Sequence, residues 1–103
     1  LRQNIAARSS QLFERLSLIR DMFGDLVQES GARGRGLLVG LPMKKAAHAA
    51  EVVALARQRG VLLLSAGSDT LRFVPSLTAS RAEVDEAMDV LESCLVVVRE
   101  GAK

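Results

Sequence analysis

The strongest constraint on the fold lies near the end of the sequence, where a capping box opens a long amphipathic segment. Ser80 and Glu83 form the S-x-x-E pattern, in which each side chain bonds the other residue's backbone N–H, so a helix is predicted to begin directly after Ser80. Apolar residues then recur at helical spacing and share one face of that helix: Val84, Met88, Leu91, Leu95 and Val98. Because such a face has to be buried against another element, the chain must fold into packed layers.

Two further segments show the same helical spacing. The first covers about residues 2–23 and is stopped by Gly24. The second covers about residues 45–59 and is followed by Gly60. The apolar residues that define these faces are Ile5, Leu12, Leu16, Ile19, Phe23 and Leu26 in the first segment and Ala49, Val52, Val53 and Ala56 in the second.

Three short apolar runs predict the strands of a sheet. They are Leu37–Leu41, bounded by Pro42; Val61–Leu64; and Leu71–Val74, stopped by Pro75. The loop between the last two runs is polar and contains a glycine, which favours an antiparallel hairpin. The glycine-rich stretch before the first run is predicted to be a turn.

The order helix, strand, helix, strand, strand, helix predicts an α/β (α+β sandwich) fold, a small three-stranded sheet with helices on one face. The length suits a single domain, residues 1–103. The chain starts with Leu1 inside a predicted helix, as a piece of a longer chain would. The other sheet face is left without cover from this chain, so we expect a missing domain or a partner to dock there if that face is apolar.

Composition excludes several classes of function. The chain has 14 Lys and Arg against 12 Asp and Glu, and a formal charge of +2 gives little field for binding nucleic acid. Cys94 is the only cysteine and His48 the only histidine, so neither a disulfide, a metal site nor a Ser-His-Asp arrangement is expected. We expect His48 at the surface or as a cap and Cys94 as a small packing residue. The single cysteine fits an intracellular setting. No apolar run approaches the roughly 18 residues that span a bilayer, so a soluble protein without membrane contact is expected.

The glycine-rich stretch is a weak candidate for anion binding. Gly34, Gly36 and Gly40 precede or lie within a predicted strand, whereas a phosphate-binding loop places its glycines between a strand and a helix. A tight turn is therefore favoured. Arg33 and Arg35 are suited to binding an anion, but a solvated turn or an internal ion pair is the commoner fate of such charges.

Arg72 points most clearly to a function. Alternation along its strand places Leu71 and Phe73 on one face and Arg72 with Val74 on the other. If Leu71 and Phe73 face the helices, Arg72 projects from the uncovered face of the sheet. A guanidinium on a rigid strand suits two-pronged binding of a carboxylate, and an ordinary strand-edge arginine is the alternative.

Four segments carry a resemblance to a known family: RGRGLLVG at residues 33–40, RGVLL at 59–63, Gly67 with LRFVPSLT at 71–78, and EVDEA at 83–87. In this order and spacing they resemble the C-terminal domain of class III pyridoxal-phosphate aminotransferases, and within that class the acetylornithine aminotransferases. The resemblance covers nearly the whole chain. It implies the C-terminal small domain of fold type I pyridoxal-phosphate enzymes.

The resemblance also implies an activity. The family moves an amino group from N-acetylornithine to 2-oxoglutarate in arginine biosynthesis, as a homodimer with pyridoxal 5'-phosphate. The arginine of its R-x-x-P-x-L segment binds the substrate α-carboxylate, which assigns this role to Arg72, followed here by Pro75 and Leu77. Ser76 stands where the family usually has a second proline. The implied compartment is the mitochondrial matrix in a eukaryote and the cytoplasm in a bacterium.

By the same resemblance, the rest of the cofactor site belongs to a preceding large domain. That domain carries the Schiff-base lysine, the acid that pairs with the pyridine nitrogen and the phosphate cup, and Lys44, Lys45 and Lys103 lack the matching context. We therefore expect this chain alone to hold no cofactor and no catalytic residue, and to be inactive. The alternative is a stand-alone small α/β interaction module that binds a partner through its uncovered sheet face.

Overall fold

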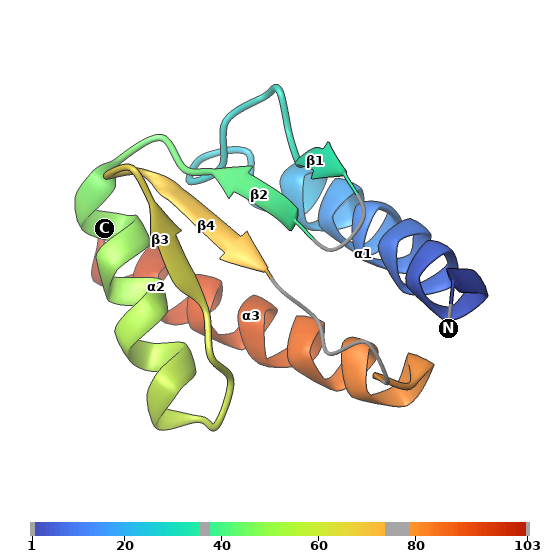
Figure 1. The fold of residues 1–103 in the computed structure, drawn as a ribbon. Helices are drawn as coiled ribbons and strands as arrows, with labels where there is room; N and C mark the ends of the chain where they lie inside the picture. Colours follow the sequence, from blue (N-terminus) through green and yellow to red (C-terminus); the bar gives the residue numbers. More distant parts are fainter. Residues whose placement is uncertain (1, 36–37, 74–78, 103) are drawn as a thin grey trace.

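A computed structural model of the chain describes residues 2–35, 38–73 and 79–102, which form three helices and four strands (Figure 1). The helices are α1 (Arg2–Met22), α2 (Ala46–Gln58) and α3 (Arg81–Gly101). The strands are β1 (Arg33–Arg35), β2 (Leu38–Pro42), β3 (Leu64–Ala66) and β4 (Thr70–Phe73). The predicted α/β fold is confirmed, with one strand more than the sequence predicted.

The helix ends follow from local sequence signals. Ser80 Oγ accepts a hydrogen bond from the Glu83 N–H (3.1 Å), and Glu83 Oε1 accepts one from the Ser80 N–H (3.0 Å), which confirms the capping box. After α2, Gly60 has a φ of 84°, a left-handed conformation that glycine adopts without strain. All three helices lie where the apolar spacing predicted them.

The sheet has the strand order β1-β2-β4-β3, and every neighbouring pair is antiparallel. The short polar loop between β3 and β4 makes the predicted antiparallel hairpin. β2 and β4 are the two central strands, so β4 is hydrogen-bonded on both sides (Figure 1).

β1 differs from the prediction, because Arg33–Arg35 was expected within a turn. In the structure Arg33 lies opposite Gly40, and Gly34 lies opposite Val39. This edge strand has three residues and no apolar side chain, so neither length nor alternation marks it in the sequence. Residues 36 and 37, which were expected to belong to the turn and to the first strand, lie outside the described residues.

β3 is displaced toward the C-terminus from the predicted run Val61–Leu64. The Val61 N–H donates to the Ala56 carbonyl oxygen (2.9 Å), so this residue still completes the end of α2 and pairing with β4 begins only at Leu64. The run is also not fully buried, since Leu62 is 70% exposed and Leu64 46%. Residues 74–78, which include the predicted strand end at Pro75, lie outside the described residues.

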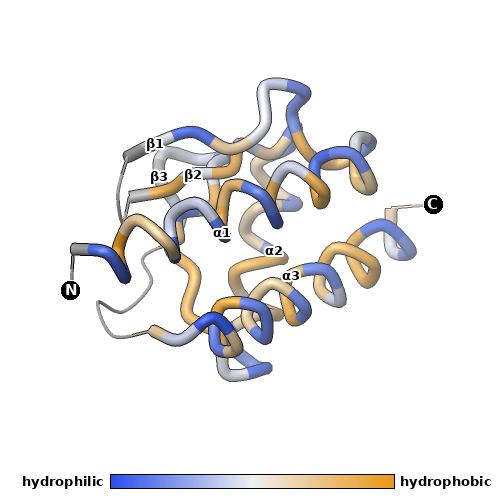
Figure 2. The backbone as a smooth tube through the Cα atoms, turned by 90° about the vertical axis from the view of Figure 1, so that its right-hand side faces the viewer, coloured by the Kyte–Doolittle hydropathy of each residue, from blue (hydrophilic) through white to orange (hydrophobic). Residues whose placement is uncertain are grey.

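The helices cover one side of the sheet, as predicted (Figures 1 and 2). α1 packs on β2, α2 packs on β3 and β4, and α3 packs against both α1 and α2. The predicted core residues are buried in one cluster that joins the helices to the inner face of the sheet: Leu12, Leu16, Ile19, Val52, Leu71, Phe73, Val84, Met88, Leu91 and Leu95. Within the described part of the chain, no helix is long and apolar enough to cross a membrane.

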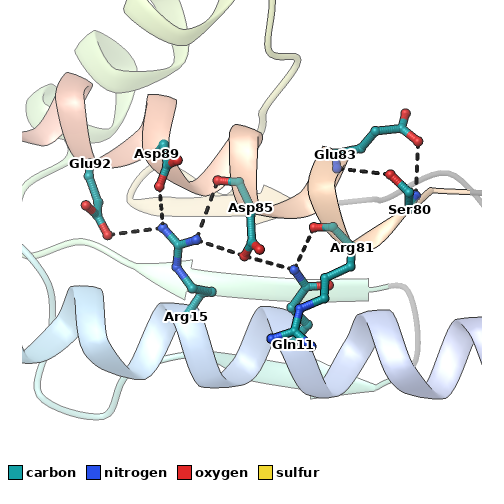
Figure 3. Close-up of polar contacts among 8 residues, drawn as sticks. All are labelled: Gln11, Arg15, Ser80, Arg81, Glu83, Asp85, Asp89 and Glu92. Atoms are coloured by element: carbon teal, nitrogen blue, oxygen red, sulfur yellow. Dashed lines mark hydrogen bonds and ion pairs between the residues drawn. The ribbon is translucent and has the colours of Figure 1, made fainter.

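A cluster of ion pairs joins α1 to α3 at the edge of this core (Figure 3). Arg15 on α1 lies 2.9 Å from Asp85 Oδ1, 2.8 Å from Asp89 Oδ1 and 3.3 Å from Glu92 Oε1, all on α3. The three carboxylates are spaced by helical turns, so they line one edge of α3. Gln11 on α1 donates to Asp85, and Arg99 near the end of α3 donates to the carbonyl oxygen of Met22 at the end of α1, so the two helices run in the same direction, side by side (Figure 2).

Candidate anion-binding site

Arg72 lies on β4, one of the two central strands of the sheet. Leu71 and Phe73, its neighbours on β4, are 0% and 4% exposed and belong to the core, whereas Arg72 is exposed. Alternation then directs Arg72 away from the helices, which confirms the predicted direction. Because β4 is paired on both sides, the start of the Arg72 side chain is fixed in place.

The register of the sheet puts Arg72 in a row that crosses all four strands. Gly40 on β2 lies opposite Arg72, Arg33 on β1 lies opposite Gly40, and Leu64 on β3 lies opposite Arg72 on the other side. Paired residues of antiparallel strands point to the same face, so these four residues share the outer face of the sheet. Arg33 and Leu64 are both exposed.

Gly40, which pairs with both arginines, contributes no side chain to the row between Arg33 and Arg72. A Cβ at Gly40 would lie 3.1 Å from Thr70 Cγ2, which is tighter than an ordinary contact. Thr70 is itself buried, and its hydroxyl donates to Asp69 Oδ1 (3.1 Å). A glycine therefore suits this position, because a side chain would crowd the Thr70 methyl group.

The Arg72 side chain is exposed on the outer side of the sheet. It makes no hydrogen bond or ion pair with any residue that the structure describes, in contrast to Arg15, whose donors meet three carboxylates. A guanidinium presents its N–H groups as a planar fork that matches the two oxygens of a carboxylate. The geometry of Arg72 is therefore suited to binding a carboxylate from the outer side of the sheet.

His48 and Cys94 show no sign of catalytic chemistry. His48 lies half-buried in the first turn of α2, and its Nδ1 has no hydrogen-bond partner among the described residues. The N-cap of α2 is Lys45, without a side-chain capping bond, so His48 does not cap the helix. Cys94 is fully buried on α3, and this burial raises the pKa of its thiol, which fits the predicted packing role. No three His, Cys, Asp or Glu residues of the described chain gather as metal ligands.

Pyridoxal phosphate does not fit the described residues. Lys44 and Lys45 are exposed on the connection between β2 and α2, and Lys103 lies outside the described residues. A hollow of about 200 Å³ opens elsewhere, beside Leu62, Phe73 and Met88, but its lining is apolar apart from Glu83. Neither place offers a lysine together with groups that could hold a phosphate.

The position of Arg33 is the feature of the site that sequence reasoning missed. Arg33 faces Arg72 across Gly40 only because β1 is a strand, and the sequence predicted a turn there. A signal for this arrangement exists in the spacing, since residues 33–35 and 38–40 are separated by two residues, as in a tight hairpin. Pro75 and Leu77, which follow Arg72 in the R-x-x-P-x-L segment, lie outside the described residues.

Sequence relatives of the chain are aminotransferases. The family model for class III aminotransferases matches residues 1–95. An acetylornithine aminotransferase of Gloeobacter violaceus is 46% identical over 89 residues, which covers 86% of this chain and 22% of that protein. A mitochondrial acetylornithine aminotransferase of Neurospora crassa is 36% identical over 98 residues, covering 95% of this chain and 20% of that protein. The chain thus spans about a fifth of the length of these curated relatives.

Solved structures give the same family. The N-acetylornithine aminotransferase of Stenotrophomonas maltophilia superposes with a TM-score of 0.83 at 34% identity, over 98% of this chain and 27% of that one. The lysine aminotransferase of M. tuberculosis superposes with a TM-score of 0.82 at 35% identity, over 92% of this chain and 21% of that one. With the family match over nearly all residues and a shared fold, the chain belongs to the class III aminotransferases.

Proposed function

We propose that the chain is the C-terminal domain of a pyridoxal-phosphate-dependent aminotransferase and that Arg72 binds the α-carboxylate of its substrate. The amino group would move from N-acetylornithine to 2-oxoglutarate, a step of arginine biosynthesis. The names of the relatives from Gloeobacter violaceus and Neurospora crassa support acetylornithine as the donor. One observation carries the proposal: Arg72 is exposed on a central strand and has no hydrogen-bond or ion-pair partner among the described residues, and the resemblance of its R-x-x-P-x-L segment supports a carboxylate-binding role.

Arg72 would act by positioning the substrate. Two parallel N–H···O bonds to a carboxylate fix both the place and the orientation of an amino acid or a 2-oxo acid. Leu71 and Phe73 anchor β4 in the core, so the backbone at Arg72 is already ordered before the substrate binds. Binding therefore loses less conformational entropy. Bound pyridoxal phosphate supplies the electron sink of the reaction. The residues that hold it are proposed to lie in a large domain of the same protein, since the described residues do not fit it.

Assembly and compartment follow the same proposal. The complete protein is proposed to be a homodimer that acts on amino acids and 2-oxo acids. If its source is eukaryotic, we propose the mitochondrial matrix, because the Neurospora crassa relative is named mitochondrial. If its source is bacterial, we propose the cytoplasm.

Substitution of Arg72 tests the proposed role in the full-length protein that carries this chain. A hydrogen bond to a charged group contributes on the order of 1.5–3 kcal/mol, so Arg72→Ala should lower kcat/KM by about 10- to 200-fold. The loss should occur with both the amino donor and 2-oxoglutarate, because both carry an α-carboxylate. Arg72→Lys should recover part of it, since an ammonium keeps the charge but loses the fork geometry.

A matched control for this test is Arg57→Ala, because Arg57 is exposed on α2, on the helical side of the molecule. This variant should keep its kcat/KM. Melting temperature and bound cofactor are measured for every variant, to separate binding from folding. An unchanged kcat/KM of Arg72→Ala for donor and acceptor alike would mean that Arg72 is only a structural strand residue.

The rival function is a stand-alone interaction module that binds a partner through the outer sheet face. The exposed Leu64 in the Arg72 row is the observation in its favour. The reading frame upstream of Leu1 separates the two functions. An upstream segment with a pyridoxal-phosphate lysine supports the aminotransferase, and a start codon directly before Leu1 supports the module.

A further inference from the structure

An acidic residue lies close to Arg72, on the loop that leads into β4. Asp69 directly precedes Thr70, the first residue of that strand. By alternation Thr70 points to the same outer face as Arg72, with their Cα atoms about 7 Å apart. Thr70 Cγ2 lies 3.1 Å from the place of a Cβ on Gly40, the partner of Arg72 on β2, which agrees with this direction. The Thr70 hydroxyl donates to Asp69 Oδ1 (3.1 Å), so the carboxylate lies near the outer face as well.

The Asp69 carboxylate is bound by neutral donors. Its Oδ1 accepts the Thr70 hydroxyl, and its Oδ2 lies 3.4 Å from Nε2 of Gln28, on the connection between α1 and β1. The same Nε2 donates to the carbonyl oxygen of Met43, directly after β2 (2.9 Å). The Met43 N–H in turn donates to the Asp69 carbonyl oxygen (2.8 Å). Each carboxylate oxygen of Asp69 therefore has a donor, and no ion pair joins Asp69 to a residue in the described ranges.

A released Asp69 carboxylate would compete with a substrate for Arg72. Asp69 is the acidic residue nearest to Arg72 along the sequence, and the two carry opposite charges at the same end of the outer face. The carboxylates of Asp69 and of a substrate both offer two oxygens to the same guanidinium fork. Arg15 shows the result of such pairing, because its donors are already occupied by three carboxylates of the chain itself.

We propose that Gln28 and Thr70 are positioning residues that hold the Asp69 carboxylate away from Arg72 and so leave the guanidinium free for the carboxylate of a substrate. The inference rests on the proposed function, because it takes the role of Arg72 from there. Its own evidence is the pair of neutral donors on Asp69, the direction of Thr70, and the lack of an ion pair between Asp69 and Arg72 in the described chain.

A double-mutant cycle in the full-length protein tests the inference. Thr70→Val removes the hydroxyl and keeps the branched shape, whereas Thr70→Ser keeps the hydroxyl. Gln28→Met removes the amide at similar side-chain length. Thr70→Val and Gln28→Met are each made alone and together with Asp69→Asn, which removes the competing charge. Gln58→Met, at the exposed end of α2, is the matched control for Gln28→Met, and melting temperatures are the check on folding.

Thr70→Val and Gln28→Met should each raise KM about two- to fivefold for the amino donor and for 2-oxoglutarate, as a competing ion pair near the surface would. The kcat should stay within about twofold, because saturating substrate displaces Asp69 from Arg72. Thr70→Ser and Gln58→Met should keep the KM of the unmodified protein. In the presence of Asp69→Asn, neither Thr70→Val nor Gln28→Met should raise KM further. An equal rise in KM with and without Asp69→Asn would show a merely structural role and overturn the inference.

Modification of Arg72 by phenylglyoxal needs no transamination, so the two proposals can fail independently. Peptide mass spectrometry gives the rate of adduct formation at Arg72, with the exposed Arg57 of the same sample as the reference. Thr70→Val should slow this rate about two- to fivefold, and Asp69→Asn should remove the difference. That pattern in a protein that does not transaminate acetylornithine supports the inference and contradicts the proposed function. Equal rates with and without Thr70→Val, in a protein that transaminates through Arg72, support the proposed function and overturn the inference.

Discussion

Arg15 and Arg72 show that the direction of a side chain can follow from its neighbours in sequence, whereas its partners can come from residues far along the chain. Arg72 projects from the outer face because Leu71 and Phe73, its immediate neighbours, are buried, and this alternation is visible in the sequence. The carboxylate partners of Arg15 lie 70, 74 and 77 residues away along the chain. Sequence periodicity therefore predicted the face of Arg72, whereas the ion pairs of Arg15 required the packing of two helices.

The capping box at the start of α3 gives a prediction for a single residue. Ser80→Ala removes the oxygen that accepts the Glu83 N–H, and this N–H then has no partner within the helix. We expect the free energy of unfolding to fall by about 1 kcal/mol, the usual cost of losing an N-cap. Urea unfolding followed by circular dichroism measures this difference.

Ser10→Ala is the matched control for the cap, since it makes the same chemical change at an exposed position within α1. Alanine is the better helix former there, so stability should stay the same or rise slightly. Equal losses from the two substitutions would show that the capping bond itself contributes nothing measurable.

At the scale of elements, the helices were predictable and two of the strands were not. Each helix carries a long apolar stripe, and α3 adds a cap, so several signals agree over many residues. β1 has only Arg33, Gly34 and Arg35 and is defined by pairing with β2. β3 starts at Leu64 because the end of α2 still engages Val61. Both strand errors come from contacts between segments that no local window of sequence contains.

The interface between α1 and α3 has a second polar contact, in addition to the Arg15 cluster, near the C-terminal ends of the two helices. Arg99 Nη2 on α3 lies 2.6 Å from Asp25 Oδ1, and its guanidinium stacks 4.4 Å from the centre of the Phe23 ring. Arg99 also donates to the Met22 carbonyl oxygen (2.7 Å), the last residue of α1. Together with Arg15, this contact fixes the two helices at two points along their length.

The carboxylates of Asp25 and Asp85, at the interface between α1 and α3, predict a loss of stability in acid. Hydrogen bonding from Arg99 lowers the pKa of Asp25, and hydrogen bonding from Gln11 and then Arg15 lowers the pKa of Asp85, both from an ordinary 3.8. Because both groups hold their protons less tightly in the folded chain, their contribution is present above that value. It is lost as the pH falls below that value and through the lower pKa values of the folded state.

The measurement is the melting temperature of the chain from pH 7 downward, with the double variant Asp25→Asn/Asp85→Asn beside it. At pH 7 the variant should melt a few degrees lower, a small effect because water and salt screen these half-exposed pairs. The two curves should converge in acid, where the native carboxylates are also neutral. Glu51→Gln, on the exposed side of α2, should follow the unmodified chain throughout. Parallel curves for the double variant would contradict the assignment.

At the scale of the whole molecule, the two sides of the sheet differ in character. One side is covered by the three helices and completes a core of its own (Figure 1). The other side carries Arg33, Arg72 and the exposed Leu64, and no described helix packs on it. Because the curated relatives are about five times longer, we expect a further part of the protein to face this side. The uncovered face and the place of Arg72 on it were predictable from the sequence, but the place of Arg33 on the same face followed only from the register.

This division predicts how the chain behaves by itself. With a continuous core, the 103-residue chain should fold cooperatively, as seen by circular dichroism and a single thermal transition. It should neither retain pyridoxal phosphate through gel filtration, as judged from absorbance, nor transaminate acetylornithine, because Lys44 and Lys45 are exposed and the hollow beside Leu62 is lined by apolar residues apart from Glu83. The full-length protein should do both. A stoichiometric cofactor adduct on one lysine of the isolated chain, with turnover of acetylornithine, would contradict the proposal that the cofactor site lies in another domain.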